Sequence, residues 1–279
     1  MKLAFTKMHG AGNDFVVIDA TRERFRPTPE LLARLTDRRF GVGCDQVLVI
    51  ESPSTADVDF DYRIFNADGS EVGQCGNGSR ALALYVAEHG LSDKQRLRVR
   101  TSTSVLELQL LADQQVRVDM GPPRWASERI PLTLPVAERY RVDTAGFGSV
   151  DFGAVSMGNP HAVILVDDVD RAPVEAMGRA LQQRPEFPES VNVGFLQVLG
   201  PQAGRLRVWE RGAGETLACG SGACAAAAVG RRWGLFGERV ELQLRGGTLA
   251  LEWAGGEGDS VLMTGPAETV FTGEIEWQK

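Results

Sequence analysis

Two cysteines lie in the same sequence setting, and that setting points to a specific chemistry. Cys75 opens the motif Cys-Gly-Asn-Gly and Cys219 opens Cys-Gly-Ser-Gly, and an apolar stretch follows each motif. A cysteine placed just before glycines at a helix start has its sulfur beside unpaired backbone N–H groups and the positive end of the helix dipole, which favours the thiolate. The same N–H groups can hold a carboxylate. Two such settings predict that one thiol removes a proton from a carbon while the other delivers one to its opposite face.

The cysteine motifs belong to a longer internal repeat. The offset 219 − 75 = 144 also brings Arg63-Ile-Phe65-Asn66 onto Arg207-Val-Trp209-Glu210. At an offset of 146, Gly12-Asn13 matches Gly158-Asn159 and Gln46-Val47 matches Asn192-Val193. Several elements in one order at nearly one spacing indicate a duplicated domain, with a pseudo-twofold relation between the halves.

Four helices are predicted to position these motifs. Thr28 is the expected N-cap of a helix that runs to Arg38, with Pro29 at its first position. The two motif helices are expected over 77–89 and 221–233, each stopped by a glycine, and a further one over 174–183. The motif helices are apolar nearly all round, so they should be buried. Short alternating or apolar runs predict strands over 15–19, 46–51, 58–65, 97–100, 105–111 and 116–120, with counterparts in the second half.

These elements predict an α+β protein of two pseudo-symmetric domains. Each domain is expected to be a curved, barrel-like mixed β-sheet wrapped around a central apolar helix, with the active site in the cleft between the domains. The length of 279 residues suits two domains. We place the first over 1–130, with the segment 264–279 returning to it, and the second over 131–263.

Composition and charge argue against several kinds of partner. The chain is 43% hydrophobic and 24% charged, as in ordinary globular proteins. Its net charge of −7 and its scattered arginines leave no basic footprint for nucleic acid. No signal peptide or membrane span is predicted. We expect a cytoplasmic protein with a small-molecule partner and reduced thiols, in which Cys44 and Cys224 are small buried residues.

The proton-transfer chemistry is expected to need no cofactor. Most enzymes that remove the weakly acidic α-hydrogen of an amino acid use pyridoxal phosphate as an electron sink. None of the four lysines (Lys2, Lys7, Lys94 and Lys279) is placed convincingly for a Schiff base. The remaining route is to stabilise the charge that spreads onto the substrate carboxylate with preorganised N–H donors.

The chain resembles the diaminopimelate epimerases, in the wider fold family that includes proline racemase. The resemblance runs nearly end to end. Besides the two cysteine motifs it rests on Met8-His-Gly-Ala-Gly-Asn13-Asp-Phe, Arg38-Arg-Phe-Gly-Val-Gly-Cys-Asp45-Gln46, Phe65-Asn66-Ala-Asp-Gly-Ser, Gly158-Asn159-Pro-His161, Val191-Asn192-Val and Glu210-Arg211-Gly-Ala-Gly-Glu-Thr-Leu-Ala. It implies an isomerase that interconverts LL- and meso-diaminopimelate without a cofactor or metal, on the bacterial route to lysine and peptidoglycan. It also implies a homodimer, although Phe271 stands where some members carry a tyrosine at the dimer contact.

The resemblance also implies a set of site residues. Cys75 and Cys219 are the acid and base pair, with His161 supporting the thiols and Glu210 binding an ammonium or orienting the reacting centre. Backbone N–H groups of Gly76, Asn77, Gly220 and Ser221 hold the reacting carboxylate. The substrate's other polar groups are read by Asn13, Gln46, Asn66, Asn159, Asn192 and Arg211, the last being suited to a bidentate carboxylate pair.

Simpler interpretations stay open for several of these residues. Asn13 and Asn66 stand in turn-forming sequences, Glu210 and Arg211 could form an exposed ion pair of little energetic value, and His161 could be an ordinary loop histidine. Three other functions are alternatives: a proline or hydroxyproline racemase of the same fold, a thiol redox protein with a reversible disulfide, and a metal site built from the two cysteines, His161 and Glu210. Neither of the last two explains the paired glycine-rich helix starts.

Overall fold

The computed structural model describes residues 2–73 and 75–276 and divides into two compact units. The first unit comprises Met1–Val118 and Gly265–Lys279, and the second Asp119–Thr264. The predicted domain bounds, 1–130 with 264–279 and 131–263, stay a prediction. Residues 277–279 lie outside the described part of the chain. Within the described residues, no helix has the length and apolar character needed to cross a membrane.

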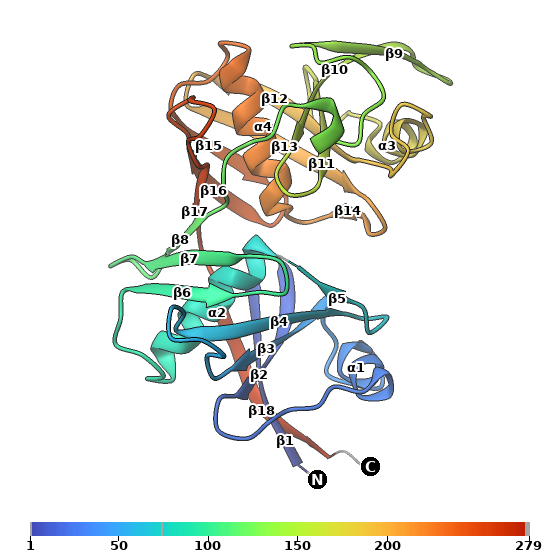
Figure 1. Cartoon of the computed structure of the whole chain (residues 1–279). Coiled ribbons are helices and arrows are strands. Elements are labelled where there is room, and N and C mark those ends of the chain that lie inside the picture. Colours follow the sequence, from blue (N-terminus) through green and yellow to red (C-terminus); the bar gives the residue numbers. More distant parts are fainter. Residues whose placement is uncertain (1, 74, 277–279) are drawn as a thin grey trace. The chain divides into compact units, whose positions relative to one another are not determined.

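The first unit is a mixed sheet with a helix on each face (Figure 1). Its strands follow one another by hydrogen bonding, with parallel pairs at β2–β3 and β4–β6 and antiparallel pairs elsewhere. Their order is β18 (Glu268–Glu276), β1 (Lys2–Gly10), β2 (Asn13–Ala20), β3 (Gln46–Glu51), β4 (Phe60–Asn66), β6 (Arg96–Arg100), β7 (Val105–Leu110) and β8 (Val116–Asp119), while β5 (Glu71–Val72) pairs with the end of β4.

The central strands β2 and β3 are apolar on both faces because each face is covered by a helix. Side chains alternate across a strand, so Val47 and Val49 join the cluster under α1 (Pro29–Thr36), whereas Leu48 lies against Gly78 at the start of α2 (Gly76–Glu88). Val47, Leu48 and Val49 are all fully buried. This two-sided burial accounts for the nearly continuous hydrophobic runs in the sequence.

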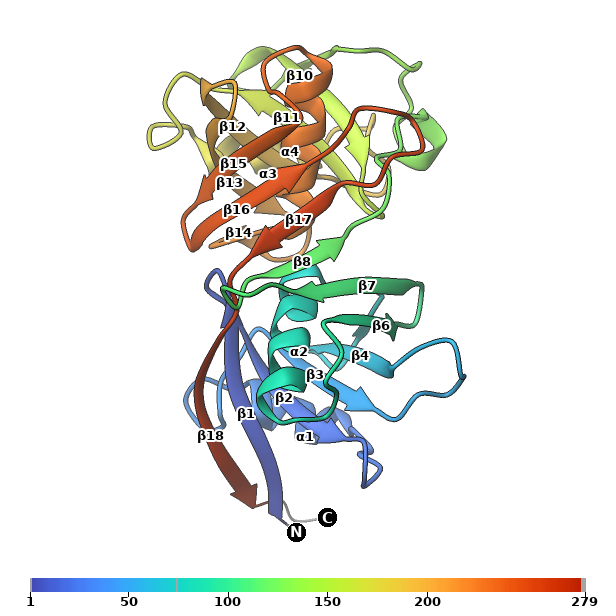
Figure 2. The ribbon, with the colours of Figure 1, turned by 90° about the vertical axis from the view of Figure 1, so that its left-hand side faces the viewer.

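The buried motif helix α2 fills the inner side of the curved sheet (Figure 2). It packs against β1, β2, β3, β7 and β18. It begins at Gly76, one position before the predicted start, with Cys75 as its N-cap, and it ends before Gly90, which adopts the positive φ of +61° typical of a helix stop. Thr28 caps α1 through a 3.3 Å bond from the Leu31 N–H, as predicted.

The second unit repeats this architecture. Its strand order is β9 (Tyr140–Thr144), β10 (Gly148–Ser156), β11 (Pro160–Leu165), β12 (Asn192–Gly200), β13 (Ala203–Glu210), β15 (Arg239–Leu244), β16 (Gly247–Glu252) and β17 (Leu262–Gly265), with β14 (Gly214–Thr216) on β13. Helix α4 (Gly220–Arg232) packs against β10 to β13, β15 and β16, and α3 (Val174–Gln182) lies against β12 and β13. The short 3₁₀ helix η1 spans Ser127–Arg129.

Matching strand registers confirm the duplication. Ile64 pairs with Val72 between β4 and β5, and Val208 pairs with Thr216 between β13 and β14, at the predicted offset of 144. Each pair of strands also carries a bidentate ion pair. Arg63 binds Glu71 at 3.1 and 2.8 Å, and their counterparts Arg207 and Glu215 bind at 2.7 and 2.9 Å. The predicted fold class, two pseudo-symmetric α+β domains, is therefore confirmed.

Candidate active site

In the first unit, the thiol of Cys75 lies at the N-terminus of α2. As the N-cap residue, Cys75 accepts a hydrogen bond from the Gly78 N–H to its Sγ, at 3.3 Å. Gly76 and Asn77 are the first residues of the helix, where backbone N–H groups have no intrahelical partner. A larger residue at position 78 would force a shift, since an added Cβ would lie 2.4 Å from the Tyr62 hydroxyl. The local setting predicted for this cysteine is confirmed.

Amide side chains surround this thiol. Oδ1 of Asn13 lies 3.8 Å from Cys75 Sγ and 3.3 Å from Asn77 Nδ2. The Asn77 oxygen in turn accepts from the guanidinium of Arg80 at 2.9 Å. Arg80 is fully buried and also donates to the carbonyl of Pro266 at 3.1 Å. The arginine was not predicted, and it ties the start of α2 to the C-terminal segment.

Gln46 and Asn66 form a second amide pair in this unit. Nε2 of Gln46 donates to Oδ1 of Asn66 at 2.9 Å, across the antiparallel strands β3 and β4. Nδ2 of Asn66 donates to Ser70 at 3.1 Å. Asn66 therefore closes the turn after β4, as its sequence suggests, and it also fixes the amide of Gln46.

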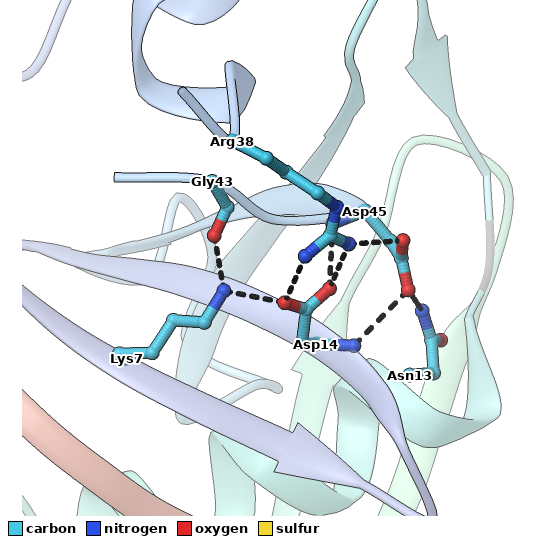
Figure 3. Close-up of polar contacts among 6 residues, drawn as sticks. All are labelled: Lys7, Asn13, Asp14, Arg38, Gly43 and Asp45. Carbon is cyan, nitrogen blue, oxygen red and sulfur yellow. Dashed lines mark hydrogen bonds and ion pairs between the residues drawn. The ribbon is translucent and has the colours of Figure 1, made fainter. Parts of the chain in front are cut away.

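A network of charged residues connects to Asn13 from the other side (Figure 3). Asp14 binds both guanidinium nitrogens of Arg38, at 2.9 and 2.7 Å, and Lys7 at 2.5 Å. Asp45 accepts from Arg38 at 2.8 Å and from Asn13 Nδ2 at 2.8 Å. Burial raises the pKa of Asp14, but the hydrogen bonds from Arg38 and Lys7 outweigh it and hold the pKa well below its usual range. Asp14, Arg38 and Asp45 belong to the motifs quoted above, but no local sequence pattern predicted that their side chains would bind one another.

In the second unit, Cys219 is the N-cap of α4 and lies beside a carboxylate. Its Sγ donates to Oε2 of Glu210 at 3.1 Å, and the other carboxylate oxygen accepts from the Thr216 hydroxyl. Burial raises the pKa of Cys219 well above its usual value, and the charge and hydrogen bond of Glu210 add to the increase. The prediction that the helix start favours the thiolate is wrong for this thiol, because burial and a nearby negative charge outweigh the helix dipole.

The Glu210 carboxylate lies beside the Cys219 thiol, and its predicted binding of a substrate ammonium stays a prediction. Glu210 is half-buried, and its carboxylate is the acceptor to which the Cys219 proton points. Ser221, the second residue of α4, has its hydroxyl 3.6 Å from the same sulfur. The N–H groups of Gly220 and Ser221 stand at the helix start, as those of Gly76 and Asn77 do in the first unit.

The buried His161 on β11 contacts the half-buried Asn159, which lies just before that strand. Nε2 of His161 lies 2.9 Å from Oδ1 of Asn159, and because an amide oxygen only accepts, Nε2 is the donor. Burial, with a smaller contribution from the charge of Arg211, lowers the pKa of His161 to about 3. The imidazole is thus neutral and orients an amide. Its predicted support of the thiols stays a prediction.

Asn192 positions the start of the Arg211 loop. The buried amide donates to the carbonyl of Pro160 at 3.0 Å and accepts from the Arg211 N–H at 2.9 Å. The exposed guanidinium of Arg211 donates to the carbonyl of Glu189 at 2.8 Å. A guanidinium has five N–H donors, and in the part of the chain that the structure describes one of them is bound in this way, which leaves capacity for a carboxylate ligand.

Each unit thus brings together half of the predicted site. The first contains Asn13, Gln46, Asn66, Cys75, Gly76 and Asn77, and the second contains Asn159, His161, Asn192, Glu210, Arg211, Cys219, Gly220 and Ser221. In both, a thiol lies at the start of a helix, where the first backbone N–H groups make no bond within the helix, and this allows proton transfer next to a bound carboxylate. Among the described residues, no three His, Cys, Asp or Glu side chains are grouped so that they could hold a metal ion.

Comparison with known proteins identifies one family. The family model described as diaminopimelate epimerase matches residues 5–126 and 153–270. A diaminopimelate epimerase from Thioalkalivibrio sulfidiphilus is 53% identical over 99% of this chain and 100% of its own length. One from Pseudomonas aeruginosa strain UCBPP-PA14 is 52% identical over 99% of both chains.

Solved structures with much lower identity share the fold. A hydroxyproline epimerase from Agrobacterium vitis, with bound trans-4-hydroxy-L-proline, has a TM-score of 0.73 at 16% identity, covering 98% of this chain and 92% of its own. A predicted epimerase from Pseudomonas aeruginosa has a TM-score of 0.66 at 18% identity, covering 99% of this chain and 100% of its own. These similarities extend to the architecture alone.

Proposed function

The chain belongs to the diaminopimelate epimerase family, and from that premise we propose that it interconverts LL- and meso-2,6-diaminopimelate without a cofactor. It is an isomerase whose reaction supplies a precursor for lysine and peptidoglycan biosynthesis. The observation that carries the proposal is identity above half over nearly the full length of both chains. The thiol at the start of each motif helix supports the same reaction.

The proposed reaction moves one proton onto the substrate and one off it. A thiolate takes the α-hydrogen as a proton, and the electron pair of the broken C–H bond spreads into the substrate carboxylate. The opposite thiol gives its proton to the other face of the same carbon. The first cysteine ends as a thiol and the second as a thiolate, so atoms and charge balance. N–H groups of Gly76, Asn77, Gly220 and Ser221 would stabilise the charge on the carboxylate.

Glu210 is proposed to receive the Cys219 proton when that thiol ionises. A donor–acceptor distance of 3.1 Å supports direct transfer between the two groups. The raised pKa of Cys219 means that the thiol is protonated at rest, so a local acceptor is needed to create the thiolate. Glu210 therefore acts on the reacting thiol rather than on the distal end of the substrate.

Recognition of a substrate with two amino-acid ends is assigned to the amide set and Arg211. Asn13, Gln46, Asn66, Asn159 and Asn192 supply uncharged donors and acceptors that suit zwitterionic groups. Arg211 supplies a charge for a second carboxylate. This set distinguishes the proposed substrate from proline or hydroxyproline, which have only one carboxylate.

We further propose a cytoplasmic homodimer. A mechanism that needs both thiols reduced suits the reducing cytoplasm. Strand β18 presents Val270 and Phe271, which are 54% and 47% exposed, and large apolar side chains at that exposure suit a subunit contact. Light scattering of the wild type and of Phe271→Asp tests the dimer, which the charged substitution is expected to weaken.

The decisive experiment is incubation of the reduced protein with LL-diaminopimelate in heavy water, with no added cofactor. Meso product that carries deuterium at the inverted carbon is expected by NMR and chiral chromatography. L-Proline and trans-4-hydroxy-L-proline serve as comparison substrates under the same conditions. Inversion of either comparison substrate with none of diaminopimelate would contradict the proposal.

A further inference from the structure

Equivalent asparagines in the two units use opposite ends of their side-chain amides to bind a neighbouring residue. Asn13 and Asn159 correspond in the internal repeat. Asn13 gives its Nδ2 to the carboxylate of Asp45 at 2.8 Å, whereas Asn159 has its Oδ1 bound to His161 at 2.9 Å. A carboxylate accepts only, so it fixes which end of the Asn13 amide faces it. The oxygen of Asn13 must then face the other way.

That oxygen faces Cys75. Oδ1 of Asn13 lies 3.8 Å from Cys75 Sγ and 3.3 Å from Asn77 Nδ2. An amide oxygen accepts a hydrogen bond from a thiol and repels a thiolate, so this orientation favours the protonated sulfur. The opposite orientation would present an N–H donor and favour the thiolate.

Asp45 is itself held in place from two directions (Figure 3). One carboxylate oxygen accepts from Arg38 at 2.8 Å, and the other accepts from the Asp14 N–H at 3.2 Å. Asp14 completes the frame by binding Arg38 and by accepting from the Asp45 N–H at 2.9 Å. The Arg38 and Asp45 side chains are 58% and 46% exposed, and ion pairs at that exposure contribute little stability. These contacts therefore fix the position of the Asp45 carboxylate and add little to the stability of the protein.

The second unit has no counterpart of this carboxylate. The repeat position of Asp45 is Val191, which is fully buried, and that of Asp14 is Pro160. Cys219 instead has the carboxylate of Glu210 as a direct acceptor. The two thiols thus meet different partners: a neutral amide oxygen in one unit and a carboxylate in the other.

We propose that Asp45 is a positioning residue that turns the oxygen of the Asn13 amide toward Cys75 and so keeps this cysteine as a thiol able to donate its proton. The inference deepens the proposed two-thiol reaction and rests on it. Asp45 acts through Asn13, and its hydrogen bonds among the described residues go to Asn13, Asp14 and Arg38.

The test is the pH dependence of Cys75 alkylation by iodoacetamide, followed by peptide mass spectrometry in the wild type and Asp45→Asn. The introduced amide can offer Asn13 either its oxygen or its NH₂ group, so only the 3.3 Å bond from Asn77 Nδ2 still opposes a turn of the Asn13 amide. One hydrogen bond to the thiolate then makes alkylation at pH 7 about tenfold faster. The pH profile moves to lower pH, while the plateau rate at high pH is unchanged. Simple loosening of the structure would raise the plateau as well.

Asp59→Asn is the matched control. Asp59 also accepts from one cationic side chain, Lys94 at 2.6 Å, and from one backbone N–H, that of Arg98 at 2.8 Å. Its loss should leave the Cys75 profile and kcat/KM unchanged, whereas Asp45→Asn should lower kcat/KM about tenfold. A second variant, Asn13→Asp/Asp45→Asn, exchanges the two groups and places a carboxylate beside Cys75. Its Cys75 profile should move to higher pH.

Unchanged Cys75 profiles in both Asp45 variants, or an equal shift in Asp59→Asn, would overturn the proposal. If Asp45→Asn does not fold, the exchange variant alone decides, and a profile that fails to move upward counts against it. Alkylation requires no substrate. A wild-type protein that does not epimerise diaminopimelate but shows the predicted shifts would therefore refute the proposed function while supporting the role of Asp45.

Discussion

Replacing Glu210 by glutamine should remove the group that accepts the Cys219 proton and leave the other site residues unchanged. The Glu210 oxygen and the Cys219 sulfur are 3.1 Å apart, and two negative charges at that distance repel by about 5 kcal/mol at an effective dielectric constant of about 20. The two groups therefore cannot both be ionised near neutral pH, and they share one proton. Ionisation of the thiol in the wild type requires Glu210 to take that proton.

The glutamine variant keeps the size of the side chain and loses the acceptor. We expect kcat/KM for LL-diaminopimelate at pH 7 to fall by roughly 10²-fold or more, the usual contribution of a positioned acid or base. The activity of Glu210→Gln should then rise about tenfold per pH unit above neutrality, because hydroxide in solution replaces the missing acceptor. Chiral chromatography of the product from pH 6 to 10 measures both effects.

Glu215→Gln is the matched control for this substitution. Glu215 lies on the neighbouring strand β14 and pairs with Arg207 at 2.7 Å and Arg245 at 3.2 Å, without a contact to Cys219 among the bonds described. Its loss should lower the urea midpoint and leave the pH–rate profile in place. Wild-type kcat/KM in Glu210→Gln at pH 7 would refute the acceptor role, and an equal loss in Glu215→Gln would assign the effect to structure.

Three further experiments test other parts of the molecule. Cys75→Ala should abolish epimerisation in both directions, as measured by chiral chromatography. Cys44→Ala should keep activity and lower the free energy of unfolding by about 1 kcal/mol. Turnover by Cys75→Ala would refute proton transfer by two thiols. His161 has a pKa lowered to about 3 by burial, so the folded state binds fewer protons than the unfolded state below pH 6.5. Stability is thus full above pH 6.5 and falls by about 1.4 kcal/mol per unit between pH 6.5 and 3; urea melts of His161→Gln should show a flatter acid limb, and an unchanged limb would contradict the buried neutral imidazole. Gly78→Ala should cost about 1–3 kcal/mol because its Cβ would lie 2.4 Å from the Tyr62 hydroxyl, and adding Tyr62→Phe should recover part of that loss, whereas simple additivity would refute the clash.

Features encoded in neighbouring residues were predictable from the sequence. Thr28 and Pro29 mark the start of α1, and Gly90 and Gly234 mark the ends of the motif helices with positive φ values of +61° and +72°. The prediction placed each motif helix one residue late, since the helices begin at Gly76 and Gly220 rather than at residues 77 and 221. The strands followed from alternation and apolar runs, and β3 has the predicted bounds.

Features that depend on packing were not predictable in this way. Arg80 stands in an apolar helix, and nothing in its neighbours indicates that it is fully buried against Asn77 and Pro266. The ionisation of Cys219 was misjudged for a related reason. The helix dipole can be inferred from local sequence, but burial and the approach of Glu210 come from tertiary structure, and here they dominate.

The repeat shows which parts of the site the duplication preserved and which it changed. The cysteine caps and the arginine–glutamate pairs are the same in both units, so the frame that holds each thiol is common. The residues around the sulfurs differ, because Asn66 corresponds to Glu210 and Asp45 corresponds to Val191. A reaction that uses two thiols on one carbon needs one of them to start with a proton and the other without. In the proposed reaction the unshared residues separate the two roles, because Cys219 has a carboxylate that can take its proton, whereas Cys75 faces a neutral amide oxygen.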